Sequence, residues 1–451
     1  MASLTKSNLP RFTADIFQNE YLAEGAREVN AIVTVTATGG GTTGGRPVGL
    51  AADAGPDAGG QAAVVIMVDC SGSMDYPPTK MRNARDATAV AIDTIRDGVA
   101  FAVVAGTHEA REVYPGGGEL AIASSASREA AKQSLRKLTA GGGTAIGTWL
   151  TLADKLFLTR REIAIRHGIL LTDGRNEHEK PEDLQRTLER VGGHFTADCR
   201  GVGTDWELPE LRRISSALLG TADIVAEPSG LADDFRSMMT AAMGKQVADV
   251  ALRVWTPANA AVKFVKQVAP DLEDLTERRA EAGPRAGDYP TGSWGDESRD
   301  YHVCVEVPAA GVGNEMLAAR ISLVLPQPDG TTEVLAQGLV KAVWTDDLAS
   351  STRISPQVAH YTGQAELASA IQEGLEARRA GDLDTATAKL GAAVRLAHES
   401  GNEGTFKLLQ GVVEVQDVKQ GTVRIRQNVS EADSMTLETR STKTVRVSPK
   451  K

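Results

Sequence analysis

The sequence predicts an α/β fold: a doubly wound, mostly parallel sheet, joined to an antiparallel β-sandwich and a small C-terminal helical bundle. Three observations lead to this prediction. Residues 63–244 alternate between short β-branched runs and helical segments, which is typical of a parallel sheet. Residues 247–346 are rich in strand patterns, and residues 355–416 are Ala/Leu-rich with helical periodicity. A chain of 451 residues has room for roughly two to four such domains.

The N-terminal segment, residues 1–62, contains one predicted strand. Residues 28–36 alternate and are β-branched, whereas residues 37–61 are rich in Gly, Ala, Thr and Pro and predict a flexible linker. The strand has no obvious place in the α/β sheet that follows it. We therefore expect it to complete the β-sandwich, which would make the α/β domain (63–244) an insertion between strands of the sandwich.

The first strand of the α/β domain carries the most informative pattern in the chain. Five apolar residues, 64–68, run directly into Asp69-Cys70-Ser71-Gly72-Ser73. The run is too short for a membrane span and reads as a buried parallel strand. The polar residues after it would lie at the carboxyl end of the sheet, where doubly wound folds bind ligands. Two hydroxyls and a carboxylate suit a hard divalent cation, which prefers oxygen ligands.

Two further loops of the α/β domain supply oxygen atoms at the same predicted edge. Thr144 follows the glycine run 141–143, which interrupts two predicted helices, 127–138 and 145–157. Asp173 follows a third strand, residues 163–172. Because carboxyl ends of parallel strands meet at one edge, we expect both side chains near Asp69.

Together these positions resemble the metal-ion-dependent adhesion site (MIDAS) of von Willebrand factor A domains, here of the bacterial cytoplasmic type. The pattern is present in the family's order, and the resemblance covers residues 63–244. It implies a bound Mg²⁺, with Mn²⁺ and Ca²⁺ as alternatives, and a coordination position left for a Glu or Asp of a partner protein. The implied function is a non-enzymatic protein-binding adaptor with no catalytic residues. The implied metal ligands are Asp69, Ser71, Ser73, Thr144 and Asp173.

The amino-acid composition excludes some classes of binding partner and indicates a cellular compartment. The net charge of −10 argues against nucleic acid, because phosphate binding needs a basic surface. Three cysteines, 70, 199 and 304, give no disulfide framework and indicate a reducing compartment. Residues 1–17 lack an apolar signal region, and no apolar run approaches about 18 residues, so we expect a cytoplasmic protein without a membrane span.

Two alternative functions remain open at this point. A metal-dependent hydrolase could use Asp69 and Asp173, with His178 as general base, although the histidines are otherwise scattered. A regulatory subunit of an ATP-driven AAA+ ring complex is the second, since the same fold serves there. The acidic residues Asp75, Glu177 and Glu179 predict a negative rim around the site, so a partner should bring basic residues.

The second half of the chain follows in three parts. We predict a β-sandwich over residues 245–350, with residues 278–297 as a long loop, because this stretch is polar and rich in Gly and Pro. Residues 355–417 predict a helical bundle, with a turn at Gly381-Asp382 between two of its helices. Residues 418–451 are rich in Ser, Thr and charge, and we expect a disordered tail.

The tail suggests a second kind of contact. Several threonines alternate with basic residues there, and phosphorylation would create a ligand for Arg-bearing readers. The family resemblance implies Ser/Thr kinases, phosphatases and forkhead-associated (FHA) domain proteins as partners of such a tail. The candidate phosphoacceptors are Thr436, Thr439, Thr442 and Thr444.

Overall fold

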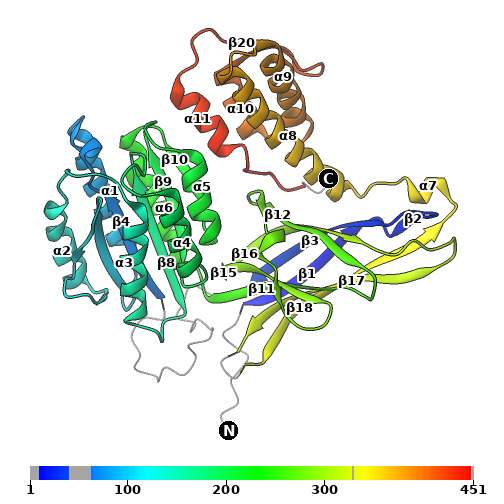
Figure 1. Cartoon of the computed structure of the whole chain (residues 1–451), viewed down its shortest axis with the longest axis horizontal. Coiled ribbons are helices and arrows are strands. Elements are labelled where there is room, and N and C mark those ends of the chain that lie inside the picture. Colours follow the sequence, from blue (N-terminus) through cyan, green and yellow to red (C-terminus); the bar gives the residue numbers. More distant parts are fainter. Residues whose placement is uncertain (1–9, 40–61, 328–329, 448–451) are drawn as a thin grey trace.

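The computed structural model describes residues 10–39, 62–327 and 330–447. It contains an α/β domain, a two-sheet β-domain and a C-terminal helical region, each occupying its own part of the molecule (Figure 1). The predicted fold class is confirmed. The Gly-rich linker predicted before the α/β domain falls on residues 40–61, outside the described residues.

The α/β domain is organised around strand β4 (Ala62–Asp69), whose eight residues are all buried. The sheet order is β10-β9-β8-β4-β5-β6, and β7 pairs with the edge of β5. Strands β4, β5, β8, β9 and β10 are parallel, while β6 and β7 run antiparallel to β5. The other strands are β5 (Ala100–Gly106), β6 (Ala110–Tyr114), β7 (Ala121–Ile122), β8 (Ile165–Thr172), β9 (Thr196–Val202) and β10 (Ala222–Val225).

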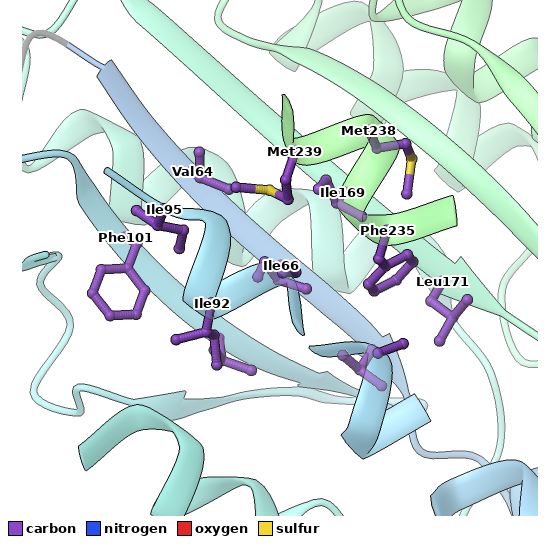
Figure 2. Close-up of a cluster of buried hydrophobic side chains, with 14 of the residues drawn as sticks. Val64, Ile66, Ile92, Ile95, Phe101, Ile169, Leu171, Phe235, Met238 and Met239 are labelled. Carbon is purple, nitrogen blue, oxygen red and sulfur yellow. The ribbon is translucent and has the colours of Figure 1, made fainter. Parts of the chain in front are cut away.

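Helices cover both faces of this sheet, so strand β4 is apolar on both sides. On one face, Ile66 of β4 lies among Ile92 of α1 and Phe235 of α6 (Figure 2). On the other, Val65 and Met67 belong to a core with α3, α4 and α5. The helices are α1 (Thr79–Thr94), α2 (Ser125–Ser134), α3 (Ile146–Leu158), α4 (Pro181–Val191), α5 (Leu208–Ala217) and α6 (Leu231–Met243).

The β-domain is built from chain segments that precede and follow the α/β domain in the sequence. Strand β3 (Glu28–Thr38) lies between β1 and β16, in a sheet of order β1-β3-β16-β12-β13. The second sheet has the order β14-β15-β11-β17-β18-β2. The chain thus leaves the sandwich after β3 and returns at β11, and the α/β domain is inserted between them. The N-terminal segment contributes three strands, β1 (Arg11–Gln18), β2 (Tyr21–Ala23) and β3, whereas the sequence predicts one.

The stretch 278–297 is not the long loop that its composition suggested. It contains β15 (Ala286–Trp294), which pairs with β11 and buries Tyr289 and Trp294. Tertiary burial of these two aromatic side chains outweighs the weak strand propensity of Gly and Pro. The remaining strands are β11 (Val247–Trp255), β12 (Ala261–Ala269), β13 (Glu273–Asp274), β14 (Ala280–Glu281), β16 (Glu297–Glu306), β17 (Glu315–Pro326) and β18 (Thr332–Thr345).

The helical region extends further than predicted. After the short α7 (Leu348–Ser351), helices α8 (Pro356–Arg379), α9 (Leu383–Glu399) and α10 (Glu403–Val412) pack together. The expectation of a disordered tail from residue 418 was wrong over residues 418–447. Strands β19 (Val413–Asp417) and β20 (Thr422–Ile425) form a hairpin, and α11 (Glu431–Arg440) follows. Residues 448–451 lie outside the described residues.

Burial explains why this polar segment is ordered. Leu437 of α11 is fully buried in the core of the helical region, and Met435 is buried against the α/β domain. The Ser430 hydroxyl accepts a hydrogen bond from the Asp433 backbone N–H and caps the helix. A few anchoring apolar residues and a cap are therefore enough to fold a segment whose overall composition is that of a disordered tail.

Candidate metal site

Strand β4 ends in a buried carboxylate. Asp69 is fully buried; its Oδ1 accepts a hydrogen bond from the Ser71 backbone N–H (2.8 Å), and its Oδ2 accepts one from Thr172 Oγ1 (2.6 Å). Burial raises the pKa of Asp69 to about 6, with a smaller contribution in the same direction from Asp173, while the hydrogen bonds from Ser71 and Thr172 oppose the shift. Burial therefore makes the ionised form of Asp69 less favourable, and the two hydrogen bonds partly offset this effect.

Two hydroxyls link the end of β4 to the end of β8. Ser71 Oγ and Ser73 Oγ lie 3.0 Å apart, and Ser73 Oγ donates to Asp173 Oδ1 at 2.6 Å. Ser71 and Asp173 are buried, whereas Ser73 is exposed. The group therefore opens to solvent on the side of Ser73.

The glycine run brings the third loop to the same place. The Gly141 N–H donates to the Cys70 carbonyl (2.8 Å), and the Gly72 N–H donates to the Gly142 carbonyl (2.9 Å). These bonds hold the loop that carries Thr144 against the loop that carries the serines. A Cβ added at Gly174 would lie 3.2 Å from Ser73 Oγ and 3.8 Å from Thr144 Oγ1, so a larger residue would crowd the Ser73 hydroxyl where the loops meet.

The structure thus gathers side chains of all five predicted positions at one edge of the sheet. Three neutral hydroxyls and two carboxylates form an all-oxygen donor set, which fits a hard divalent cation. Two buried carboxylates close together also call for positive charge. Among the described residues there is no cluster of three or more His, Cys, Asp or Glu side chains, the grouping typical of a zinc centre. The residues present therefore fit Mg²⁺ better than a nitrogen- or sulfur-preferring metal.

A basic residue in this group was not expected from the sequence. Lys80, in the first turn of α1, places its Nζ 2.7 Å from Asp173 Oδ2. The same nitrogen lies 3.7 Å from an Asp205 carboxylate oxygen. The only sequence signal is its position, seven residues after Ser73 in the segment that follows the first strand.

The predicted acidic rim is present only in part. Asp75 and Glu177 are exposed beside the site. Glu179 instead accepts hydrogen bonds from the Gly147 backbone N–H (2.8 Å) and from Asn176 Nδ2 (3.0 Å). It stabilises the N-terminus of α3, where a negative charge is favourable, and is not free to meet a partner.

The histidines nearest the site support its loops. His178 Nδ1 accepts a hydrogen bond from the Thr144 backbone N–H (3.3 Å), and His108 Nδ1 accepts one from the Gly143 N–H (3.4 Å). The Nδ1 lone pair of each ring is therefore already engaged. His167 and His194 pair with Asp198 and Asp154 elsewhere in the domain. This arrangement gives no support to His178 as a general base.

The four candidate phosphoacceptors lie on or after α11. Thr439 is 2% exposed, and Thr444 Oγ1 donates to the Val268 carbonyl at 2.6 Å. Thr436 and Thr442 are partly exposed. Thr439 and Thr444 would have to leave these surroundings before a kinase could reach them, so a phosphorylation site at either requires local opening of the segment.

Comparison with known proteins yields two family models. The von Willebrand factor type A domain model matches residues 62–224. The von Willebrand factor type A C-terminal domain model matches residues 395–441, which include the β19–β20 hairpin and all of α11. Within the described residues, no helix is long and apolar enough to cross a membrane.

Among solved structures, a von Willebrand factor type A protein from Catenulispora acidiphila is 52% identical, with a TM-score of 0.90 over 98% of this chain and 99% of that chain. The ArnB paralog VWA2 from Sulfolobus acidocaldarius is 12% identical, with a TM-score of 0.58 over 97% of this chain and 100% of that chain, and shows a shared fold.

A curated relative, the uncharacterized protein sll0103 from Synechocystis, is 30% identical over 218 residues, 47% of this chain. The chain spans about half the length of that relative, 49%. The α/β domain and the C-terminal region each match a model of the same family, and the match to the Catenulispora structure extends over nearly the whole chain. The chain belongs to the von Willebrand factor type A family.

Proposed function

We propose that this protein is a non-enzymatic adaptor that captures a Glu or Asp side chain of a partner protein at a divalent cation, preferably Mg²⁺. The observation that carries the proposal is the convergence of three loops into one all-oxygen group, two of them at the ends of β4 and β8 and the third before α3. Von Willebrand factor type A domains are in general protein-interaction modules, and they bind divalent metals through a MIDAS. The residues that would hold the cation are Asp69, Ser71, Ser73, Thr144 and Asp173.

The residues of the site are arranged to bind an anionic side chain of a partner. The hydroxyls of Ser71, Ser73 and Thr144 can bind a cation without neutralising it. Thr172 and the Ser71 N–H orient Asp69, so that its charge is fixed before any partner arrives. A bound Mg²⁺ supplies a strong positive charge that attracts a carboxylate. The exposed side of Ser73 is where that carboxylate would enter.

The surroundings of the site indicate what else the partner carries. Asp75 and Glu177 add negative charge beside the opening, so basic residues should flank the partner's acidic one. Tyr76 is 83% exposed, three residues after Ser73. A large exposed aromatic side chain beside a polar site is a frequent binding hot spot, so we expect the partner to cover Tyr76 with an apolar group.

The cellular setting of this adaptor is also a proposal. We place it in the cytoplasm, in signalling by Ser/Thr kinases and FHA-domain proteins. Phosphorylation would involve Thr436 or Thr442 first, because these two are partly exposed. Intact mass after incubation with a cognate kinase tests this, and an unchanged mass would argue against it.

Affinity purification with the full-length chain as bait tests the adaptor proposal. We expect partner capture in Mg²⁺ buffer and its loss with EDTA. Ser71→Ala and Asp173→Ala should each abolish capture while leaving the circular dichroism spectrum unchanged. Ser134→Ala, at the partly exposed C-terminal end of α2, is the matched control and should capture normally. Capture that survives both site variants and the chelator would refute the proposal.

A further inference from the structure

The Lys80 ammonium occupies a special place in the candidate metal site. It lies 2.7 Å from Asp173 Oδ2, and the other oxygen of the same carboxylate accepts a hydrogen bond from Ser73 Oγ at 2.6 Å. Lys80 is therefore linked to the proposed cation site through one of the two carboxylates that would hold the cation. Its side chain is 13% exposed and that of Asp173 is fully buried, so solvent screens this pair weakly.

The chain fixes Lys80 in this position. The residue is in the first turn of α1, which begins at Thr79 and packs across the end of β4. Its backbone N–H donates to the Pro77 carbonyl at 2.9 Å. Nζ also lies 3.5 Å from the Ser73 carbonyl oxygen. Lys80 is thus tied by its backbone and its head group to the loop that carries the two site serines.

We infer that Lys80 is a built-in counter-cation that lowers the affinity of the site for divalent metal and keeps the loaded site positive. The inference rests on the proposed metal-dependent function and deepens it. Asp69 and Asp173 contribute two negative charges and Lys80 one positive charge, so these three groups together carry −2 + 1 = −1. A divalent cation brings the total to +1, and a partner carboxylate then brings it to zero.

The same count without Lys80 gives a different outcome. The two carboxylates alone carry −2, and a divalent cation neutralises them completely. The metal would bind more tightly, because a like charge has been removed, but the loaded site would offer less attraction to an incoming carboxylate. Lys80 therefore lowers the affinity of the site for metal and strengthens the attraction of the loaded site for an anion.

Isothermal titration of the full-length chain with MgCl₂ and with MnCl₂ tests this directly. Lys80→Met removes the charge and keeps the stem, while Lys80→Gln removes the charge and keeps a donor for Asp173. Both variants should bind each metal at least about tenfold more tightly than wild type, which corresponds to about 1.4 kcal/mol. Lys132→Met is the control: Lys132 pairs with Asp93 and Glu129 on the domain surface and should leave metal affinity unchanged.

Thermal melting gives a second readout that does not depend on any partner. With EDTA, both Lys80 variants should melt below wild type, because Asp69 and Asp173 are left without a counter-charge. Saturating Mg²⁺ should raise their melting temperatures more than that of wild type, as binding linkage requires.

The outcomes separate this inference from the proposed function. If wild type binds neither Mg²⁺ nor Mn²⁺, the proposed function fails and the role of Lys80 fails with it. If wild type binds metal but both Lys80 variants bind within twofold of it, or more weakly, Lys80 is not a competing counter-cation. In that case the adaptor proposal still stands.

Discussion

At the scale of single residues, the candidate site is defined by a few side chains that form hydrogen bonds with one another. Asp173 shows this best: one of its oxygens accepts from Ser73 and the other from Lys80, and the side chain is fully buried. A neighbouring glycine, Gly174, leaves room for the hydroxyls of Ser73 and Thr144. Loss of any one of these groups should affect metal binding more than folding, since the strands behind them are buried independently.

The exposed aromatic ring of Tyr76 leads to a prediction about binding alone. Tyr76→Ala should weaken partner capture by at least about 1 kcal/mol, because a hot-spot contact area is lost. Mg²⁺ affinity and melting temperature should stay at wild-type values, since the side chain is 83% exposed. Quantitative pull-down across a dilution series measures the effect. Tyr21→Ala, on strand β2 of the sandwich, is the matched control, and an equal loss in both variants would contradict the prediction.

A buried histidine makes stability depend on pH. Burial, with a smaller effect of Lys266, lowers the pKa of His302 from 6.5 to about 4. Between these two values the unfolded chain binds a proton that the folded chain does not, so stability is lost as pH falls from 6.5 towards 4. At pH 5 this costs roughly 2 kcal/mol relative to pH 7.5.

Urea denaturation of wild type and His302→Gln at both pH values checks this. The glutamine can keep a hydrogen bond to Asn30, whose Oδ1 lies 2.9 Å from His302 Nε2. The variant should lose less stability than wild type on going from pH 7.5 to pH 5, by roughly 2 kcal/mol. A pH dependence that is the same in both proteins would show that His302 is not responsible.

At the scale of elements, close packing of a helix on a strand fixes the position of the glycine loop. Trp149 of α3 lies over Gly106 at the end of β5, and its Nε1 donates to the Thr107 carbonyl at 2.6 Å. A Cβ at Gly106 would approach the indole ring to 2.3 Å. Since α3 begins two residues after Thr144, this contact helps to place the third site loop.

Gly106→Ala should therefore destabilise the protein by about 1–3 kcal/mol through overpacking, and it should also weaken Mg²⁺ binding as α3 shifts. Gly363→Ala is the matched control. Gly363 is inside α8, and a Cβ there would meet nothing within 4 Å. That variant should gain about 0.5–1 kcal/mol from helix propensity. Urea denaturation measures both, and a neutral Gly106→Ala would contradict the packing argument.

At the scale of the whole molecule, the C-terminal segment joins all three parts. Arg440 and Lys443 both pair with Asp223 at the start of β10, where α11 lies beside the α/β domain (Figure 1). Although burial alone would raise it, these two cations hold the pKa of Asp223 below its usual value. Beyond them, Thr444 and Arg446 bind the β-domain at Val268 and Asp300.

Removing both cations should release this segment. We expect Arg440→Gln combined with Lys443→Gln to destabilise the chain by about 1–3 kcal/mol, because Asp223 stays buried and loses its partners. Hydrogen exchange across residues 431–447 should accelerate, while β4 stays protected. Lys389→Gln, which breaks an exposed pair with Glu373, is the control and should change neither. Unchanged exchange at α11 would show that other contacts hold the segment.

The sequence by itself determined the α/β fold and the set of candidate ligands. Strand β4 could be recognised because an uninterrupted apolar run records burial on both faces, and the site residues because they directly follow such strands. Residues 28–36 could be predicted as a strand for a similar reason, because alternation is local information, and they could be assigned to the sandwich because they had no place in the α/β sheet. Periodicity and chain order are properties that a sequence displays without any distant contact.

Only the tertiary structure decided the features that depend on distant partners. Strand β15 exists because β11 pairs with it, and α11 because Met435 and Leu437 find buried surroundings, although both segments have the composition of loops. The pairing of Lys80 with Asp173 joins residues 93 positions apart. Composition averages over a segment, whereas folding depends on which few side chains are buried and against what, and that is settled only when the whole chain has folded.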